Sequence, residues 1–176
     1  IDLKNPSPEN WREVVPEAEE TIESASLVGG RMIVQYLKDA NSLVRIYDLE
    51  GVVTREVELP GIGSVWGFDG KLDDPETFYG FTGYTTPDRI YRYDIESGES
   101  TLFREAKVNV DLSPFVTSQV FYESKDDTKV PMFIVSKKGV KRDGNNPTQL
   151  YAYGGFNITI LPRISNSNND SLELGG

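Results

Sequence analysis

The chain has 176 residues and a formal net charge of −10, because 28 acidic residues outnumber 18 basic ones. This balance disfavours a phosphate-backbone partner and an anionic membrane surface, so we expect neither nucleic-acid nor membrane binding. The sequence contains no cysteine, which excludes disulfides, thiolate catalysis and cysteine-based zinc sites. It also contains no histidine, so a hydrolase that needs a Ser-His pair is incomplete here.

No run of about 18 apolar residues is present, as a membrane-spanning helix would need. The polar beginning, Ile1–Trp11, has no signal-peptide core and no initial Met. We therefore expect both ends to be cut points within a longer protein, and a cytoplasmic location with the periplasm as the alternative.

No cofactor or metal is expected either. The acidic clusters lack the spacing of a calcium loop, so we interpret them as solvated surface. They are Glu17, Glu19, Glu20 and Glu23; Asp73, Asp74 and Glu76; and Asp126 and Asp127.

Short segments with alternating apolar and polar residues dominate the first 105 positions and predict strands. Gly, Pro, Asn and Asp pairs between them predict tight turns. The predicted strands are Arg31–Leu37, Leu43–Asp48, Thr54–Leu59, Ser64–Phe68, Thr77–Thr82, Arg89–Asp94 and Ser100–Arg104.

An internal repeat connects two of these strands. Arg45–Gly51 resembles Arg89–Gly98, since each strand runs into Asp, an aliphatic residue, Glu and a Gly turn. The two aspartates stand at positions 48 and 94, a spacing of 46 residues. Four-stranded propeller blades recur at roughly 40–50 residues. Two unrelated hairpins with the same turn chemistry would be the alternative.

The pattern changes near residue 110, where we place a domain boundary between 1–110 and 111–176. Ser118–Glu123 and Lys129–Ser136 predict a hairpin, followed by a polar loop over Lys137–Pro147. Gln149–Tyr153 predicts one more strand. The polar tail, Asn166–Asp170, predicts a loop or disorder.

The strand at Gln149–Tyr153 runs into Gly154-Gly155-Phe156. Two glycines allow backbone to approach a ligand closely, and the flanking aromatics could line a pocket. Taken alone, the four residues fit a tight turn after a core strand better than they fit a site.

The neighbouring residues add a family resemblance. Val120–Val135, Lys137-Lys138-Gly139 and Tyr153–Ile158 together resemble prolyl oligopeptidases, as do Gly63–Phe68, Phe78–Thr82 and Val108–Asp111 upstream. The resemblance runs from about Trp11 to Ile160. It implies a mainly β fold: partial β-propeller blades of four antiparallel strands, followed by the first strands of an α/β-hydrolase domain.

The resemblance also implies site residues. Tyr153 would donate its phenol O–H to the oxyanion hole, and Phe156 would line the pocket for a substrate proline ring. Gly154 and Gly155 would leave room for the substrate. The Gly-x-Ser-x-Gly elbow that carries the family's nucleophile is missing here, and the family's Asp and His would follow beyond Gly176.

The sequence thus predicts an inactive fragment of a serine endopeptidase that cleaves short proline-containing peptides after proline. The alternative is a non-catalytic partial propeller that binds partners or self-associates through exposed blade edges. A related peptidase that prefers basic residues is a third candidate. In the tail, Asn166–Ser171 is polar where the family is largely apolar, so this stretch is not expected to dock into a hydrolase core.

Overall fold

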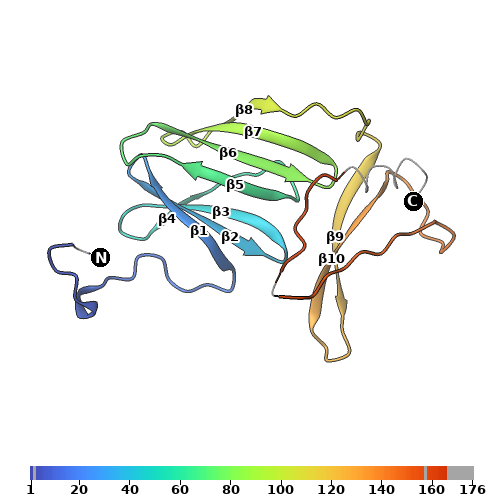
Figure 1. Ribbon diagram of the computed structural model, residues 1–176, viewed down its shortest axis with the longest axis horizontal. Coiled ribbons are helices and arrows are strands. Elements are labelled where there is room, and N and C mark those ends of the chain that lie inside the picture. Colours follow the sequence, from blue (N-terminus) through green and yellow to red (C-terminus); the bar gives the residue numbers. More distant parts are fainter. Residues whose placement is uncertain (2, 157, 166–176) are drawn as a thin grey trace.

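The first blade is a sheet of four antiparallel strands that neighbour one another in chain order (Figure 1). A computed structural model gives this structure and describes residues 1, 3–156 and 158–165. A short 3-10 helix, η1 (Pro8–Asn10), precedes the sheet. The strands are β1 (Thr21–Val28), β2 (Arg31–Lys38), β3 (Asn41–Tyr47) and β4 (Val53–Glu56).

The second blade repeats this topology. Its strands are β5 (Ser64–Asp69), β6 (Glu76–Gly83), β7 (Thr86–Asp94) and β8 (Ser100–Glu105), again antiparallel and in chain order. Seven of these eight strands were predicted from alternation. β1 was missed, because half of its residues are polar and its first five are exposed.

The main core lies between the two blades, which stack face to face (Figure 1). Alternation along β3 places Val44 and Ile46 on this face, where Ile46 is the register partner of Ile33 on β2. The second blade contributes aromatics, and the rings of Phe68 and Tyr79 stack at 4.6 Å between centroids. Such burial of alternate side chains is the main stabilising contribution in a stacked pair of sheets.

The predicted repeat is present in the structure. β3 ends at Tyr47 and β7 ends at Asp94, so the two aspartates close the third strand of each blade. Asp48 Oδ1 accepts the backbone N–H groups of Glu50 at 3.0 Å and Val52 at 2.8 Å. Asp94 Oδ1 accepts the backbone N–H of Ser97 at 2.8 Å. Each carboxylate therefore holds the turn that leads into the last strand of its blade.

The outer face of the first blade is covered, whereas the outer face of the second blade is exposed. On the first blade, Val34, Tyr36 and Tyr47 form a small buried cluster with Val15, which belongs to the segment before β1. On the second blade, Trp66, Phe78 and Phe103 are half-exposed, and the rings of Phe78 and Phe103 meet edge to face at 5.2 Å.

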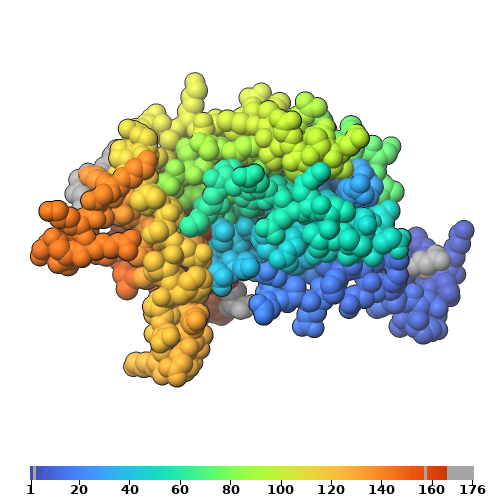
Figure 2. Space-filling view, turned by 180° about the vertical axis from the view of Figure 1, so that it is seen from behind, coloured from blue at the N-terminus to red at the C-terminus, as the bar shows by residue number. Residues whose placement is uncertain are grey.

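A separate two-stranded sheet follows the blades. It comprises β9 (Phe115–Glu123) and β10 (Lys129–Lys137) and matches the predicted hairpin. The hairpin and the loop after it project from the blades, as the yellow and orange atoms show in Figure 2. Gln149–Tyr153 is not a strand, so that prediction is wrong. The apolar run is there, but no described strand offers its backbone a partner.

The predicted polar tail, Asn166–Asp170, lies outside the described residues. Within the described residues, no helix is long and apolar enough to cross a membrane.

Candidate functional site

The sequence-predicted site lies in the loop Tyr153–Phe156, which follows the hairpin and passes below the ends of β2 and β3 in Figure 1. Tyr153 is folded back on the loop: a Cβ at Gly155 would lie 2.9 Å from the Tyr153 hydroxyl oxygen. Gly155 therefore allows the phenol to rest on the backbone. The Gly155 carbonyl accepts the Ile158 N–H at 3.1 Å, which closes a turn.

Phe156 points into solvent and is 91% exposed. Its φ of 56° lies in the left-handed region, which non-glycine residues seldom adopt. In the described chain the structure brings Tyr153 and Gly155 together, whereas Phe156 and Gly154 contact neither the phenol nor a pocket wall.

The hairpin touches the blades at their loop ends. Gln119 Nε2 donates to the carbonyl of Asp39 at 2.6 Å, in the turn between β2 and β3. The hydroxyls of Thr85 and Thr117 lie 3.2 Å apart. The ring of Phe133 meets Tyr84 at 5.6 Å. These contacts place the hairpin, and the loop that follows it, at one end of the two-blade stack.

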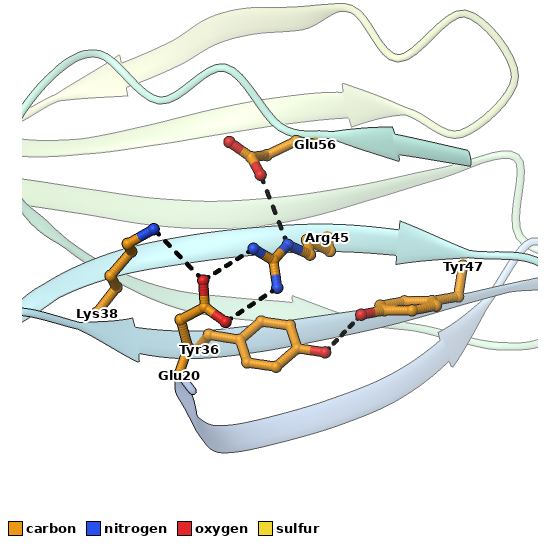
Figure 3. Close-up of polar contacts among 6 residues, drawn as sticks. All are labelled: Glu20, Tyr36, Lys38, Arg45, Tyr47 and Glu56. Carbon is orange, nitrogen blue, oxygen red and sulfur yellow. Dashed lines mark hydrogen bonds and ion pairs between the residues drawn. The ribbon is translucent and has the colours of Figure 1, made fainter. Parts of the chain in front are cut away.

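A charged cluster on the first blade was missed by the sequence interpretation (Figure 3). Arg45 donates to both carboxylate oxygens of Glu20, and Lys38 Nζ lies 3.4 Å from Glu20 Oε1. Arg45 Nε also lies 3.6 Å from Glu56 Oε2. The prediction of solvated surface is therefore wrong for Glu20, whose side chain is only 11% exposed. The hydrogen bonds from Arg45 lower the pKa of Glu20 to about 2.

Two phenols lie beneath this cluster. The hydroxyl oxygens of Tyr36 and Tyr47 are 2.6 Å apart in a buried position (Figure 3). The Arg45 guanidinium sits 5.1 Å above the centre of the Tyr36 ring, a cation–π arrangement. Burial, and then the hydrogen bond with Tyr47, raise the pKa of Tyr36 to about 12. The Tyr36 phenol is thus neutral across the physiological range, so it is not poised to release a proton there.

The sequence matches known proteins along almost its whole length. The model of the prolyl oligopeptidase N-terminal β-propeller domain matches residues 1–106. A prolyl endopeptidase of Elizabethkingia miricola is 44% identical over 174 residues, covering 99% of this chain and 24% of the relative. A prolyl endopeptidase of Dictyostelium discoideum is 35% identical over 159 residues, which is 88% of this chain and 21% of the relative.

Solved structures agree. One structure from a study of two prolyl endopeptidases superposes with a TM-score of 0.90 at 42% identity, over 100% of this chain and 26% of that chain. Prolyl oligopeptidase B from Galerina marginata, bound to a 35mer hydrolysis and macrocyclization substrate, superposes with a TM-score of 0.81 at 28% identity. This match covers 92% of this chain and 23% of that chain. The chain spans about a quarter of the length of these proteins. The two stacked four-stranded blades and the propeller-domain match show that the chain belongs to the prolyl oligopeptidase family.

Proposed function

We propose that this chain is part of a serine endopeptidase that cleaves short peptides after proline. One observation carries the proposal: the 44% identity to a prolyl endopeptidase extends over 99% of the chain and so runs through the Tyr153–Phe156 loop. The blades alone would support only a shared scaffold, because one fold serves many functions. A match that includes the loop is a stronger reason to assign the chemistry.

The proposal divides the chain in two. Residues 1–110 would be the last blades of the propeller, and residues 111–176 would begin the α/β-hydrolase domain. Two observations support this division: β8 ends at Glu105, and the hairpin β9–β10 forms a sheet of its own. The match to the N-terminal propeller domain ends at residue 106 and supports only the propeller assignment of the first part.

In the proposed mechanism, Tyr153 donates its phenol O–H to the oxygen that becomes negative when the peptide carbonyl is attacked. A preorganised neutral donor stabilises that oxyanion more than it stabilises the substrate, and so lowers the barrier. Phe156 would form a flat apolar wall for the proline ring. Gly154 and Gly155 would keep side chains away from the peptide backbone.

The nucleophilic serine, the aspartate and the histidine must come from residues outside this chain, which has no histidine at all. We therefore propose that the 176 residues alone are inactive, and that the complete enzyme acts in the cytoplasm. The propeller would limit access to a central cavity and select short peptides. The competing idea of a non-catalytic binding module gains no support from the relatives, which are named as peptidases.

The test uses chromogenic Gly-Pro and Gly-Arg peptides. The purified 176-residue chain is expected to show no turnover above buffer. A chain extended through the missing serine, aspartate and histidine is expected to cleave the Gly-Pro peptide and to leave the Gly-Arg peptide largely intact. In that extended chain, Tyr153→Phe should lower kcat by about 10²–10³-fold, the usual loss for one oxyanion-hole donor.

Tyr151→Phe is the matched control, because Tyr151 is a second exposed tyrosine two positions upstream. It is expected to leave kcat unchanged. Turnover by the 176-residue chain alone would overturn the assignment of the catalytic groups to other residues. If the Gly-Arg peptide is cleaved faster than the Gly-Pro peptide, the enzyme prefers basic residues and the proposed specificity for proline is wrong.

A further inference from the structure

The segment after the site loop returns to the second blade. We call residues 160–165 the strap. Pro162 is fully buried, and its carbonyl accepts a hydrogen bond from Ser64 Oγ at 2.7 Å. The backbone N–H of Ile164 donates to Thr82 Oγ1 at 3.4 Å. Figure 1 shows this red segment running up to the ends of β5 and β6.

The two anchoring hydroxyls lie side by side on the blade. Ser64 begins β5, Thr82 lies near the end of β6, and the two residues are direct register partners. The strap therefore attaches to both strands of one ladder at the same end. Thr82 Oγ1 in turn donates to the carbonyl of Thr86 at 3.4 Å, which leaves its lone pairs free to accept from Ile164.

The two blades are hydrogen-bonded to each other where the strap attaches. Gly63 N–H donates to Asn41 Oδ1 at 2.7 Å, and Val65 N–H donates to Ser42 Oγ at 3.0 Å. These bonds link the start of β5, on either side of Ser64, to the first two residues of β3. A segment that is anchored at Ser64 is therefore held relative to both blades, because neither blade can shift there without breaking these hydrogen bonds.

The site loop has no comparable anchor of its own. Among the described residues from Leu150 to Phe156, none hydrogen-bonds to a blade, and Tyr153 and Phe156 are largely exposed. The turn between Gly155 and Ile158 connects this loop directly to the strap. Among the described residues that follow the loop, Pro162 and Ile164 are therefore the first whose backbone is hydrogen-bonded to the propeller.

We propose that Ser64 and Thr82 are positioning residues: they hold the strap on the second blade, and the strap holds the Tyr153–Phe156 loop in place. The importance of this for catalysis rests on the proposed role of Tyr153. The anchoring itself does not, since it is a property of the folded chain. Two hydroxyls of the propeller would thus set the geometry of a loop that belongs to the other domain.

Amide hydrogen exchange of the 176-residue chain tests the proposal. In Ser64→Ala combined with Thr82→Val, exchange at the Ile164 and Ile158 amides is expected to accelerate by about three- to tenfold for each lost hydrogen bond. Amides of the blade core, such as those of Val34 and Ile46, should keep their rates. The pair Ser64→Thr and Thr82→Ser retains both hydroxyls and should restore protection at both reporters.

Ser26→Ala is the matched control. Ser26 Oγ donates to the carbonyl of Phe68 at 2.6 Å, a bond of the same kind that joins the two blades away from the strap. If this variant accelerates exchange at the Ile158 amide as much as the strap variant does, the effect is a general loosening of the fold and the proposal fails. It also fails if Ile164 loses its protection while Ile158 keeps it, because the loop is then independent of the strap.

A second measurement covers the case in which the double variant does not fold. Trypsin cleavage after Arg163, in the strap, is followed in the single variant Ser64→Ala, with cleavage after Arg142 in the exposed loop as the internal reference. The ratio of the two rates should rise by about three- to tenfold. An unchanged ratio would overturn the proposal. Neither measurement depends on turnover, so failure of the peptidase assignment would be seen separately.

Discussion

Arg45 donates two hydrogen bonds to Glu20, from Nη2 to Oε1 at 2.9 Å and from Nη1 to Oε2 at 3.3 Å. This bidentate pair fastens the residue just before β1 to the middle of β3, across 25 positions of sequence. Both side chains are mostly shielded, with exposures of 22% and 11%. Shielded pairs of this geometry lose less to water and salt than exposed ones do.

The pairing predicts an acid-sensitive stability. Its hydrogen bonds hold the pKa of Glu20 at about 2, below the ordinary value of 4.5. A depressed carboxylate pKa stabilises the fold above the unfolded pKa, and this stabilisation is lost as the pH falls towards the folded pKa. The wild-type chain should therefore be more stable than Glu20→Gln at pH 7, and the gap should narrow steadily below about pH 4.5.

Urea midpoints between pH 7 and pH 3 measure this gap. Glu19→Gln serves as the control, because Glu19 is an exposed neighbour that forms no ion pair with another described residue. That variant should follow the wild type at every pH. A gap for Glu20→Gln that stays constant down to pH 3 would contradict a stabilisation that depends on the ionised carboxylate.

The hydroxyl pair of Tyr36 and Tyr47 predicts non-additive mutations. Tyr36→Phe strands the Tyr47 hydroxyl in a position that is only 4% exposed, at a cost of about 1–3 kcal/mol. Removing both hydroxyls leaves no unpaired group, so Tyr36→Phe combined with Tyr47→Phe should be close to the wild type. Equilibrium unfolding of the two single variants and the double variant gives the coupling energy. Losses that simply add would show that the bond contributes nothing.

Much of the fold could be predicted because the blades bury alternate residues. β3 alternates regularly between buried and half-buried residues, and the predicted strand Leu43–Asp48 overlaps the observed Asn41–Tyr47. The repeat was found because Asp48 and Asp94 perform the same local task, which requires the same residues at the same place. β1 was missed since an exposed, polar strand carries no period-2 signal, and only pairing with β2 defines it.

The site was harder to predict for two physical reasons. The pairing of strands in the sheet brings Glu20 and Arg45 together, and no sequence spacing predicts such a contact before the strand register is known. Gln149–Tyr153 has strand-like residues, but a strand needs a neighbour for its backbone, and the described chain supplies none. The roles of Tyr153 and Phe156 came from the family resemblance and stay predictions, because no contact among the described residues tests them.

Two glycines on the second blade predict very different costs for the same substitution. A Cβ at Gly63 would overlap the carbonyl oxygen of Thr82 and the buried ring of Phe81, neither of which can move away. The nearest atoms to a Cβ at Gly80 all belong to the ring of Trp66, which is partly in solvent and can turn. Gly63→Ala should therefore lower the free energy of unfolding by about 1–3 kcal/mol, and Gly80→Ala should lower it by clearly less.

Thermal unfolding of the two variants, measured side by side, checks this order. The Trp66 fluorescence of Gly80→Ala should also shift, since the ring must leave its place over the backbone. Equal losses of stability would show that the Trp66 ring is held as firmly as Phe81 is.

The uncovered face of the second blade predicts self-association. Trp66, Phe78 and Phe103 are 43%, 40% and 56% exposed on one face, beside the free edge of β8. Apolar faces and unpaired strand edges both recruit partners, and a second copy is the partner present in a pure sample. Sedimentation velocity should therefore show an average mass that rises with concentration.

Phe78→Ser combined with Phe103→Ser should return the chain to the monomer, because the change removes the edge-to-face pair at the centre of that face. Leu49→Ser is the control, since Leu49 is similarly exposed but lies in the turn after β3 of the first blade. It should leave the association unchanged. A wild-type chain that stays monomeric at every concentration would contradict the prediction. The exposed aromatics would then be tolerated in water, and the free blade face would not by itself drive assembly.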